Sequence, residues 1–166
     1  MDNVILIGMP GCGKSTVGVV LAKSLGFGFV DTDLIICEQQ GQKLQRLIDQ
    51  KGIDKFLEIE EQTGLNLNCK NTVVATGGSM VISEKAMEHL KSMGKVVYIN
   101  VPLKELKNRI TNMKTRGIVF KKGETLDDIF KTRTPLYEKY ADLTVNVTKE
   151  GSLENTVSKI VSGLNG

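Results

Sequence analysis

The sequence predicts an α/β fold of three layers, in which a five-stranded parallel sheet carries helices on both faces. Short apolar stretches alternate with amphipathic helical patterns along the whole chain. Two of these stretches contain continuously apolar runs, residues 73–75 and 96–99, as expected of strands that are buried on both faces. There is no internal repeat and no low-complexity linker, so residues 1–166 are expected to form a single domain.

The first half of the chain contains three of the expected strands. The complete set of expected strands is 3–7, 28–30, 72–75, 95–100 and 142–147. Apolar side chains recur at helical spacing after the first strand and predict a helix over residues 14–25. Glycines near positions 41 and 52 divide the stretch 32–67 into two or three helices.

The later helices are recognised by their ends. Ser83 has the residue type of an N-cap, and its helix is expected to end near Gly94. Pro102 is expected to start a helix over residues 102–112, at the position that proline favours. Two further helices are expected near 124–140 and from Ser152 to about Leu164.

Composition indicates an ordinary globular protein and excludes several functional classes. Charged residues make up 25% of the chain, and the net charge of +3 is too small to indicate a nucleic-acid partner. No apolar run approaches the roughly 18–20 residues that cross a membrane. The first strand begins directly after Asp2, which leaves no room for a signal peptide, so we expect a cytoplasmic protein. The small size favours a monomer.

The turn after the first strand carries the strongest motif. Residues 8–16, with the sequence GMPGCGKST, fit the phosphate-loop pattern G-x-x-x-x-G-K-[ST] between a strand and a helix. Glycines allow backbone N–H groups to surround a phosphate, toward which the following helix directs the positive end of its dipole. The alternative, a glycine-rich turn with a lone surface lysine, fits fewer of these features. The expected nucleotide contacts are Gly11, Cys12, Gly13, Lys14, Ser15 and Thr16, with Cys12 toward the outside of the loop.

Carboxylates and further glycines follow the next two strands. Asp31 and Asp33 come directly after the second strand, where one can hold Mg²⁺ and the other can orient a substrate hydroxyl. An N-cap role on the next helix is equally compatible with these two residues, and both roles can coexist. Gly77 and Gly78 offer backbone N–H groups to a substrate, although a turn that needs positive φ is the simpler explanation.

Two arginines complete the candidate set. Arg116 precedes a polar segment that contains glycines and lysines, which is typical of a lid that brings an arginine onto phosphates. Arg133 begins the stretch RTPLY and can hold a carboxylate through two hydrogen bonds. Arg133 is equally compatible with a simple surface position.

Taken together, these motifs resemble the shikimate kinase family of small phosphate-loop kinases. The resemblance rests on the phosphate loop, the D-[ST]-D motif at 31–33, the glycines at 77–78, a lid arginine and the R-x-P-L-Y motif at 133–137, in this order. It implies a three-layer phosphate-loop kinase fold with a substrate-binding segment at about 32–67 and a mobile lid at about 111–125. It also implies transfer of a phosphoryl group from ATP, with Mg²⁺, to a hydroxyl of shikimate in aromatic amino-acid biosynthesis.

The resemblance assigns a role to each candidate residue. Lys14 and Arg116 are expected to stabilise charge on the transferred group, and Arg109 matches the arginine on the adenine side. Ser15 is expected to ligate Mg²⁺, and Asp31 to hold the ion through water. Asp33 is the candidate base, Arg133 the carboxylate clamp, and the acceptor ring is expected to lie against Gly77, Gly78 and Ser79.

Two positions depart from the family pattern. The family motif F-R-x-x-E reads FLEIE at residues 56–60, so Leu57 stands where a second carboxylate-binding arginine is expected, and Ser79 replaces the third glycine of a triplet. These changes leave two alternatives open. One is a related kinase for another hydroxy acid or polyol, such as gluconate, and the other is a nucleotide-binding module without transfer activity.

Overall fold

The structure, a computed structural model, describes residues 2–110, 123–148 and 151–166. Its centre is a sheet of five parallel strands in the order β2-β3-β1-β4-β5. The strands are β1 (Asn3–Ile7), β2 (Gly28–Asp31), β3 (Thr72–Ala75), β4 (Gly94–Asn100) and β5 (Leu143–Asn146). Every residue of β1 and β3 is buried, which agrees with their apolar sequences. The predicted parallel sheet is therefore confirmed, with strand ends within one residue of expectation.

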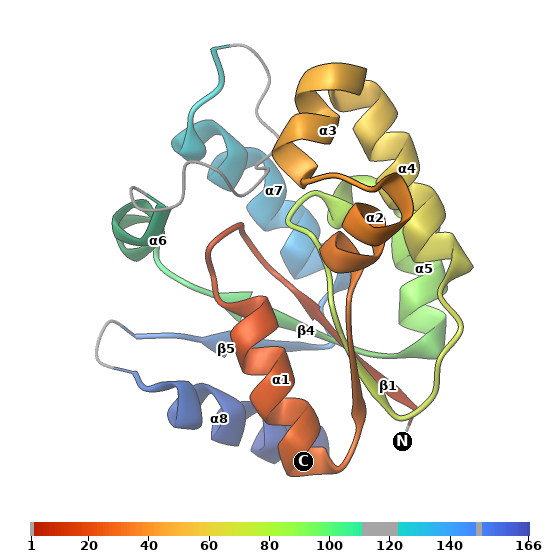
Figure 1. The fold of residues 1–166 in the computed structure, drawn as a ribbon. Coiled ribbons are helices and arrows are strands. Elements are labelled where there is room, and N and C mark those ends of the chain that lie inside the picture. Colours follow the sequence, from red (N-terminus) through yellow and green to blue (C-terminus); the bar gives the residue numbers. More distant parts are fainter. Residues whose placement is uncertain (1, 111–122, 149–150) are drawn as a thin grey trace.

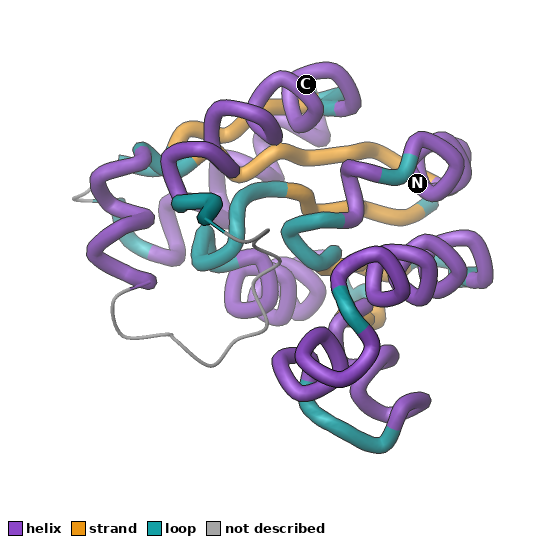
Figure 2. Tube along the Cα trace, turned by 90° about the horizontal axis from the view of Figure 1, so that it is seen from above, coloured by secondary structure: helices purple, strands orange, loops and turns teal. Residues whose placement is uncertain are grey.

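Helices cover both faces of this sheet. In Figure 1, α1 (Lys14–Leu25) and α8 (Leu153–Asn165) lie on one face, and α5 (Glu84–Met93) and α7 (Leu126–Tyr140) lie on the other. Figure 2 shows the strands as a layer between the helices. The remaining elements are α2 (Thr32–Gln40), α3 (Leu44–Lys51), α4 (Ile53–Asn66), α6 (Leu103–Ile110) and a short 3₁₀ turn, η1 (Met80–Ile82). The predicted three-layer α/β fold is confirmed.

Local capping explains where several helices begin. Ser83 accepts a hydrogen bond from the backbone N–H of Ala86, as its predicted N-cap role requires. The helix expected to start at Pro102 starts at Leu103, because the Pro102 carbonyl is the acceptor of the first helical hydrogen bond. Thr125 and Asp128 form a capping box that fixes the start of α7 at Leu126.

Helices α2, α3 and α4 form a group with a small core of its own. The core consists of five buried apolar residues, Ile36, Leu44, Leu47, Ile48 and Phe56. Leu57 is partly buried and packs against this cluster. Figure 1 shows the group above the strand ends, beside the loop that follows β1. The predicted segment 32–67 therefore corresponds to three helices, broken at Gly41 and Gly52 as expected.

The longest helix of the described ranges, α7, has 15 residues. A membrane-spanning helix needs about 20 apolar residues. Accordingly, none of the helices in the described part of the chain is long and apolar enough to cross a membrane.

Asn3, at the start of β1, is a buried polar residue that joins three segments. Its side-chain Nδ2 donates to the carbonyls of Cys69 (2.8 Å) and Met93 (3.1 Å), and its Oδ1 accepts from the Thr72 N–H (3.1 Å). The residue is 1% exposed, so water cannot replace these partners. Asn3 therefore holds the loop before β3, the start of β3 and the end of α5 against the first strand.

We expect Asn3→Ala to destabilise the protein because it leaves buried backbone groups without partners. Each unsatisfied group costs about 1–3 kcal/mol, so the free energy of unfolding should fall by at least about 2 kcal/mol. Urea unfolding followed by circular dichroism measures this change, with Asn68→Ala, an exposed loop asparagine, as the matched control. Equal stability of the two variants would contradict the structural role of Asn3.

Candidate active site

The loop between β1 and α1 has the geometry of an anion-binding turn. Gly13 has φ 94°, in the left-handed region that favours glycine, and α1 begins at the next residue. The first N–H groups of α1 have no helical partners and point out of the helix N-terminus. Ser15 and Thr16 are exposed there, on the first turn. The predicted phosphate-loop residues are therefore gathered at the carboxyl end of the central strand.

Lys14 is folded back over this loop. Its Nζ donates to the carbonyl oxygens of Gly8 (2.7 Å) and Met9 (3.0 Å), and it lies 3.6 Å from the Cys12 Sγ. The side chain is 8% exposed. An ammonium group has three donors, and the sulfur is the weakest of its three acceptors, so a phosphate oxygen can replace it at little cost. Lys14 can therefore reach a phosphate while it still braces the loop.

The sequence predicts that Cys12 faces the outside of the phosphate loop, and this prediction is wrong. Cys12 is 3% exposed and its Sγ lies in the interior beside Lys14. A free cysteine behaves as a small apolar side chain and is among the residue types most often buried. The contact that Cys12 can offer a nucleotide is consequently its backbone N–H rather than its thiol.

A groove lies beside the phosphate loop, between the start of α1 and the start of α8. Arg109, on α6, donates from Nη1 to the Gly11 carbonyl (3.3 Å) and from Nε to Glu105 (3.4 Å). Two groups of residues line the groove. The first, from the phosphate loop, α1 and α6, is Cys12, Gly13, Thr16, Val17 and Arg109, and the second, from after β5 to the first turn of α8, is Val147, Gly151, Ser152, Leu153 and Thr156. Sequence analysis missed the second set, although its position after the last strand could have indicated it.

Asp31 combines the two roles that the sequence left open. Its Oδ1 accepts from the N–H groups of Asp33 (2.9 Å) and Leu34 (3.3 Å), so it caps α2. Its Oδ2 accepts from the Ser15 hydroxyl at 2.6 Å. The cap holds the carboxylate still, and the hydrogen bond brings two oxygen ligands together beside the phosphate loop. Oxygen ligands of this kind suit Mg²⁺, which needs only one or two from the protein.

Asp33 and Glu60 converge on Gly77. A Cβ on Gly77 would lie 2.6 Å from both the Asp33 Oδ1 and the Glu60 Oε2, so any side chain there would displace the carboxylates. Burial, followed by the neighbouring charge of Asp31, raises the pKa of Asp33 to about 6, against the opposing effect of Lys14. Burial is also the main reason that the pKa of Glu60 rises to about 7. Two carboxylates with raised pKa values thus meet at one point beside the phosphate loop.

Glu60 is a candidate site residue that sequence analysis missed. It is 2% exposed, and its Oε1 accepts a hydrogen bond from the Ser79 hydroxyl at 2.5 Å. Glu60 fills the glutamate position of the F-R-x-x-E motif, although the sequence analysis assigns it no role. The signal that could have found it is a lone acidic residue on the otherwise apolar face of an amphipathic helix.

Glycine is required at positions 77 and 78 because neighbouring atoms approach closely, and not because the backbone has a positive φ. Neither residue is among the glycines with positive φ in the described ranges, so the turn that the sequence suggested is wrong. A Cβ on Gly78 would lie 2.7 Å from the Pro10 Cγ, within the phosphate loop. The loop after β3 therefore packs directly on the loop after β1. Ser79, with φ −101°, needs no glycine.

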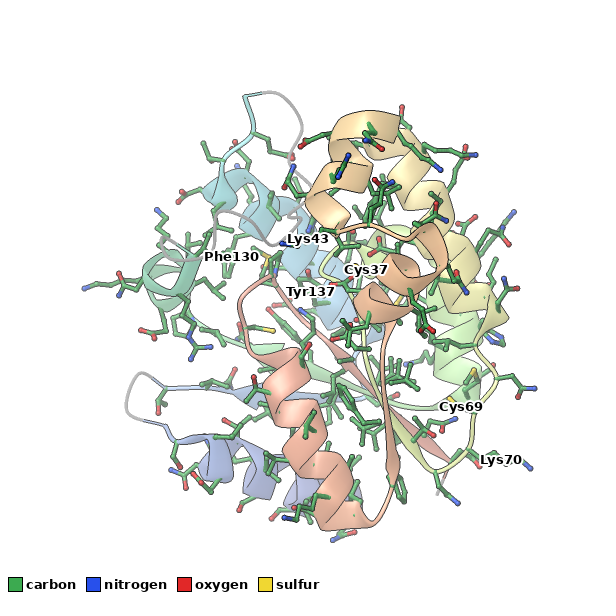
Figure 3. All side chains as sticks on the ribbon, in the orientation of Figure 1. Cys37, Lys43, Cys69, Lys70, Phe130 and Tyr137 are labelled. Carbon is green, nitrogen blue, oxygen red and sulfur yellow. The ribbon has the colours of Figure 1, made fainter. Side chains whose placement is uncertain are left out.

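Arg133 and Tyr137 reach this cluster from α7. The stretch RTPLY lies inside the helix, with Pro135 included, and Arg133 is 5% exposed. The Tyr137 hydroxyl donates to the Gly78 carbonyl at 2.6 Å, and its ring stacks on Tyr98. Figure 3 shows Tyr137 between the loop after β1 and α2. The charge of Arg133 partly offsets the rise in the pKa of Glu60, so the guanidinium lies near enough to interact with that carboxylate.

A second pocket, of about 200 Å³, lies next to Glu60. It is lined by Asp54, Leu57, Glu58, Glu60, Glu61, Ser79, Ile82 and Ser83. Leu57 is on its wall, at the position where the sequence comparison expects an arginine. These lining residues include four carboxylates and no basic side chain. Arg116 and the lid predicted at 111–125 cannot be located in the same way, because residues 111–122 lie outside the described part of the chain.

Comparison with known proteins identifies close relatives. The family model "Shikimate kinase" matches residues 10–165. A shikimate kinase of Clostridium botulinum (strain Okra / Type B1) is 37% identical over 158 residues, which are 92% of each protein. Threonine synthase-like 1 of Homo sapiens is 34% identical over 164 residues, 98% of this chain but only 22% of that protein. The chain thus spans about a fifth of that relative.

A solved structure supports the same relationship. The structure of shikimate kinase from Acinetobacter baumannii in complex with shikimate superimposes with a TM-score of 0.91 at 31% identity. The match covers 99% of this chain and 93% of that protein. The whole of the described fold is therefore shared with that structure.

The raised pKa of Glu60 predicts a pH-dependent effect of Glu60→Gln on stability. The ordinary pKa of 4.5 applies to the unfolded chain, and about 7 applies to the folded protein. As pH rises between these values, the unfolded chain releases its proton first, so the carboxylate costs the folded state about 3 kcal/mol above pH 7. Glu60→Gln should therefore raise the melting temperature at pH 8 and have little effect at pH 5.

Differential scanning calorimetry at both pH values checks this, with Glu88→Gln, an exposed carboxylate on α5, as the control. A stabilisation that is the same at pH 5 and pH 8 would show that Glu60 does not titrate in this range.

Proposed function

The chain belongs to the shikimate kinase family, and we propose on this basis that it transfers the γ-phosphoryl group of ATP to a hydroxyl of shikimate. The observation that carries the proposal is the contact between the phosphate loop and the loop that follows β3. Gly78 packs on Pro10 of the phosphate loop, and the Asp33 carboxylate lies beside Gly77. A hydroxyl bound by Asp33 is thereby brought next to a phosphate bound by Lys14, as in-line transfer requires.

The nucleotide side uses the phosphate loop and the groove beside it. The backbone N–H groups at the start of α1 bind the β-phosphate, and the Lys14 ammonium neutralises charge on the transferred group. Arg109 is fixed to the loop by its bond to the Gly11 carbonyl, and it is suitably placed to contact the base or ribose in the groove. Arg116, in the predicted lid, supplies a second positive charge at the phosphates.

Ser15 and Asp31 are the residues that would hold Mg²⁺. Their oxygens lie 2.6 Å apart on a capped, fixed backbone, and a hydroxyl with one carboxylate is the kind of protein contribution that Mg²⁺ accepts beside phosphates. When bound, the ion would neutralise charge on the β- and γ-phosphate oxygens.

On the acceptor side, Asp33 accepts the hydrogen bond of the reacting hydroxyl. In the transfer, the hydroxyl oxygen bonds to the γ-phosphorus, the bond to the bridging oxygen of ADP breaks, and the hydroxyl proton passes to Asp33. Arg133 binds the carboxylate of the acceptor with its planar guanidinium. Gly77, Gly78 and Ser79 form the surface on which the ring rests.

A second candidate is a kinase for another hydroxy acid or polyol, such as gluconate. The observation that favours it is the acidic pocket around Leu57, which lacks the second cation of the family pattern. Loss of one charge-assisted contact weakens binding of a carboxylate by about 1.5–3 kcal/mol, or roughly ten- to a hundredfold. Shikimate is the leading candidate because Asp33, Gly77, Gly78 and Arg133 of the family pattern are present.

We also propose that the protein is a cytoplasmic monomer and that it binds no nucleic acid. A net charge of +3 offers little attraction to a polyanion. Among the described residues, three large apolar side chains are exposed, which is little apolar surface for self-association. Val19 is on α1, Leu34 on α2, and Ile82 on η1.

The direct test is a coupled ADP-release assay with Mg·ATP and shikimate, gluconate or quinate. We expect release that depends on shikimate. Asp33→Asn should lower kcat by about 100-fold or more, the usual scale of a positioned base, and leave the KM for ATP within about threefold. Equal losses in kcat and in ATP affinity would argue against an acceptor-side role for Asp33. Release only with another acceptor would transfer the proposal to that compound.

Leu57→Arg tests whether shikimate is the natural acceptor. Restoring the second cation should lower the KM for shikimate by about tenfold, because it adds a charge-assisted contact to the carboxylate. Leu57→Met keeps an apolar side chain against the α2–α4 core and is the matched control. A KM that is unchanged in both variants would favour an acceptor without a carboxylate at this position.

A further inference from the structure

The second group of groove residues follows an edge strand of the sheet. Within the described sheet, β5 has four residues and pairs with β4 alone. Figure 1 shows β5 beside β4. Val147, the first residue after β5, lines the groove. An edge strand leaves one row of its backbone groups without strand partners, so the position of its end depends on further contacts.

Two asparagines join the ends of β4 and β5. Asn100 and Asn146 are partners in the parallel register, and the Asn100 Nδ2 donates to the Asn146 Oδ1 at 2.9 Å. The Val147 N–H donates to the Asn100 carbonyl at 2.9 Å. Lys159, on α8, donates from its Nζ to the Asn146 carbonyl at 3.0 Å. The asparagine pair thus holds the start of the groove wall and is joined to α8, which supplies two further groove residues.

The orientation of the Asn100 carboxamide is set by Tyr98. The Tyr98 hydroxyl donates to the Asn100 Oδ1 at 3.1 Å, which leaves the Nδ2 to face Asn146. A carboxamide has a donor end and an acceptor end, so its direction follows from its partners. If Asn100 turned by 180°, its oxygen would face the oxygen of Asn146. The Tyr98 hydroxyl therefore selects the orientation in which the asparagine pair forms.

Tyr98 itself is held in place from α7. Its side chain is 1% exposed and stacks on Tyr137, with the ring centroids 5.2 Å apart and an angle of 25° between the rings. Burial raises the pKa of Tyr98, against the opposing effect of the Thr134 hydroxyl, so the Tyr98 hydroxyl stays protonated. A fixed ring that carries a protonated hydroxyl is well suited to orient a hydrogen-bond acceptor.

We propose that Tyr98 and Asn100 are positioning residues for nucleotide binding. The Tyr98 hydroxyl orients Asn100, and Asn100 holds the wall that begins at Val147 against the base and ribose of the nucleotide. Neither side chain is among the described residues that line the groove, so both act through the chain that follows β5. This inference rests on the proposed function in one respect, namely that the groove takes a nucleotide.

This arrangement separates two parts of the bound nucleotide. The phosphates bind at the loop between β1 and α1, and every residue of β1 is buried at the centre of the sheet. The base and ribose lie against the wall that follows the edge strand. Loss of the Tyr98 hydroxyl should therefore weaken the binding of a nucleotide but not the binding of a phosphate chain alone.

The test is isothermal titration calorimetry on the full chain with two ligands, Mg·ADP and Mg·tripolyphosphate, the second of which has neither ribose nor base. Tyr98→Phe should raise the Kd of Mg·ADP about three- to tenfold, the scale of one hydrogen bond, and leave the Kd of Mg·tripolyphosphate within about twofold. In an Asn100→Ala background, Tyr98→Phe should add less than about twofold, because its acceptor is already absent.

Two further variants complete the experiment. Tyr140→Phe removes the hydroxyl of another buried tyrosine, outside this chain of hydrogen bonds, and is the matched control that should change neither Kd. Asn146→Ala, at an exposed position, removes the far end of the asparagine pair without opening the core. It should reproduce the selective loss of Mg·ADP binding, and it decides the proposal if Tyr98→Phe does not fold.

Equal weakening of both ligands, or no weakening of either, would overturn the proposal, as would independent, multiplicative effects of Tyr98→Phe and Asn100→Ala. None of these measurements requires turnover. If the wild-type protein transfers no phosphoryl group but the variants lose Mg·ADP selectively, the inference holds while the proposed function fails. A wild-type protein that does not bind Mg·ADP would overturn both.

Discussion

The whole site depends on one close approach, that of the loop after β3 to the loop after β1. The Thr76 N–H and hydroxyl both donate to the Leu6 carbonyl, which extends the pairing of β1 and β3 to the edge of the sheet. One step further, Gly78 lies so close to Pro10 that no side chain fits between them. Because β1 is the central strand, this contact fixes the phosphate loop against the residues that face the acceptor. Tyr137 reinforces it from α7 through the Gly78 carbonyl.

The order of elements could be predicted from sequence because apolar patterning and capping residues act over a few positions. The range 14–25 was correct to the residue, and Ser83 caps its helix as expected. The predicted family membership and fold are confirmed. They could be predicted because glycines and charged residues at strand ends are local signals. The roles of the individual site residues stay predictions. What the structure adds is that Asp31 contacts Ser15 and caps α2 with its two oxygens.

Features that depend on distant contacts could not be predicted. Asn3 reads as an ordinary polar residue at a strand start, and its three partners are separated from it by 66 to 90 residues. The buried position of Cys12 could not be predicted, because nothing in the local sequence indicates that Lys14 folds back over the loop. The sequence favours a turn with positive φ as the reason for Gly77. The actual reason is its small size, because Asp33 and Glu60 approach it from α2 and α4. Glu60 itself lies 19 residues from Ser79.

The two departures from the family pattern act on the same carboxylate, although they are on different elements. Leu57 is one turn before Glu60 on α4, where a cation would have neutralised the acidic wall. With leucine there, the side chain packs on the small core of α2–α4 instead, and the charge of Glu60 loses a neighbouring cation. Ser79 supplies a hydrogen bond from the opposite wall, at a backbone position that does not require glycine. A buried carboxylate with one hydrogen bond is more stable than one with none, so the serine partly offsets the effect of the leucine. The two substitutions therefore act on the same buried carboxylate, one from α4 itself and one from the segment that precedes η1.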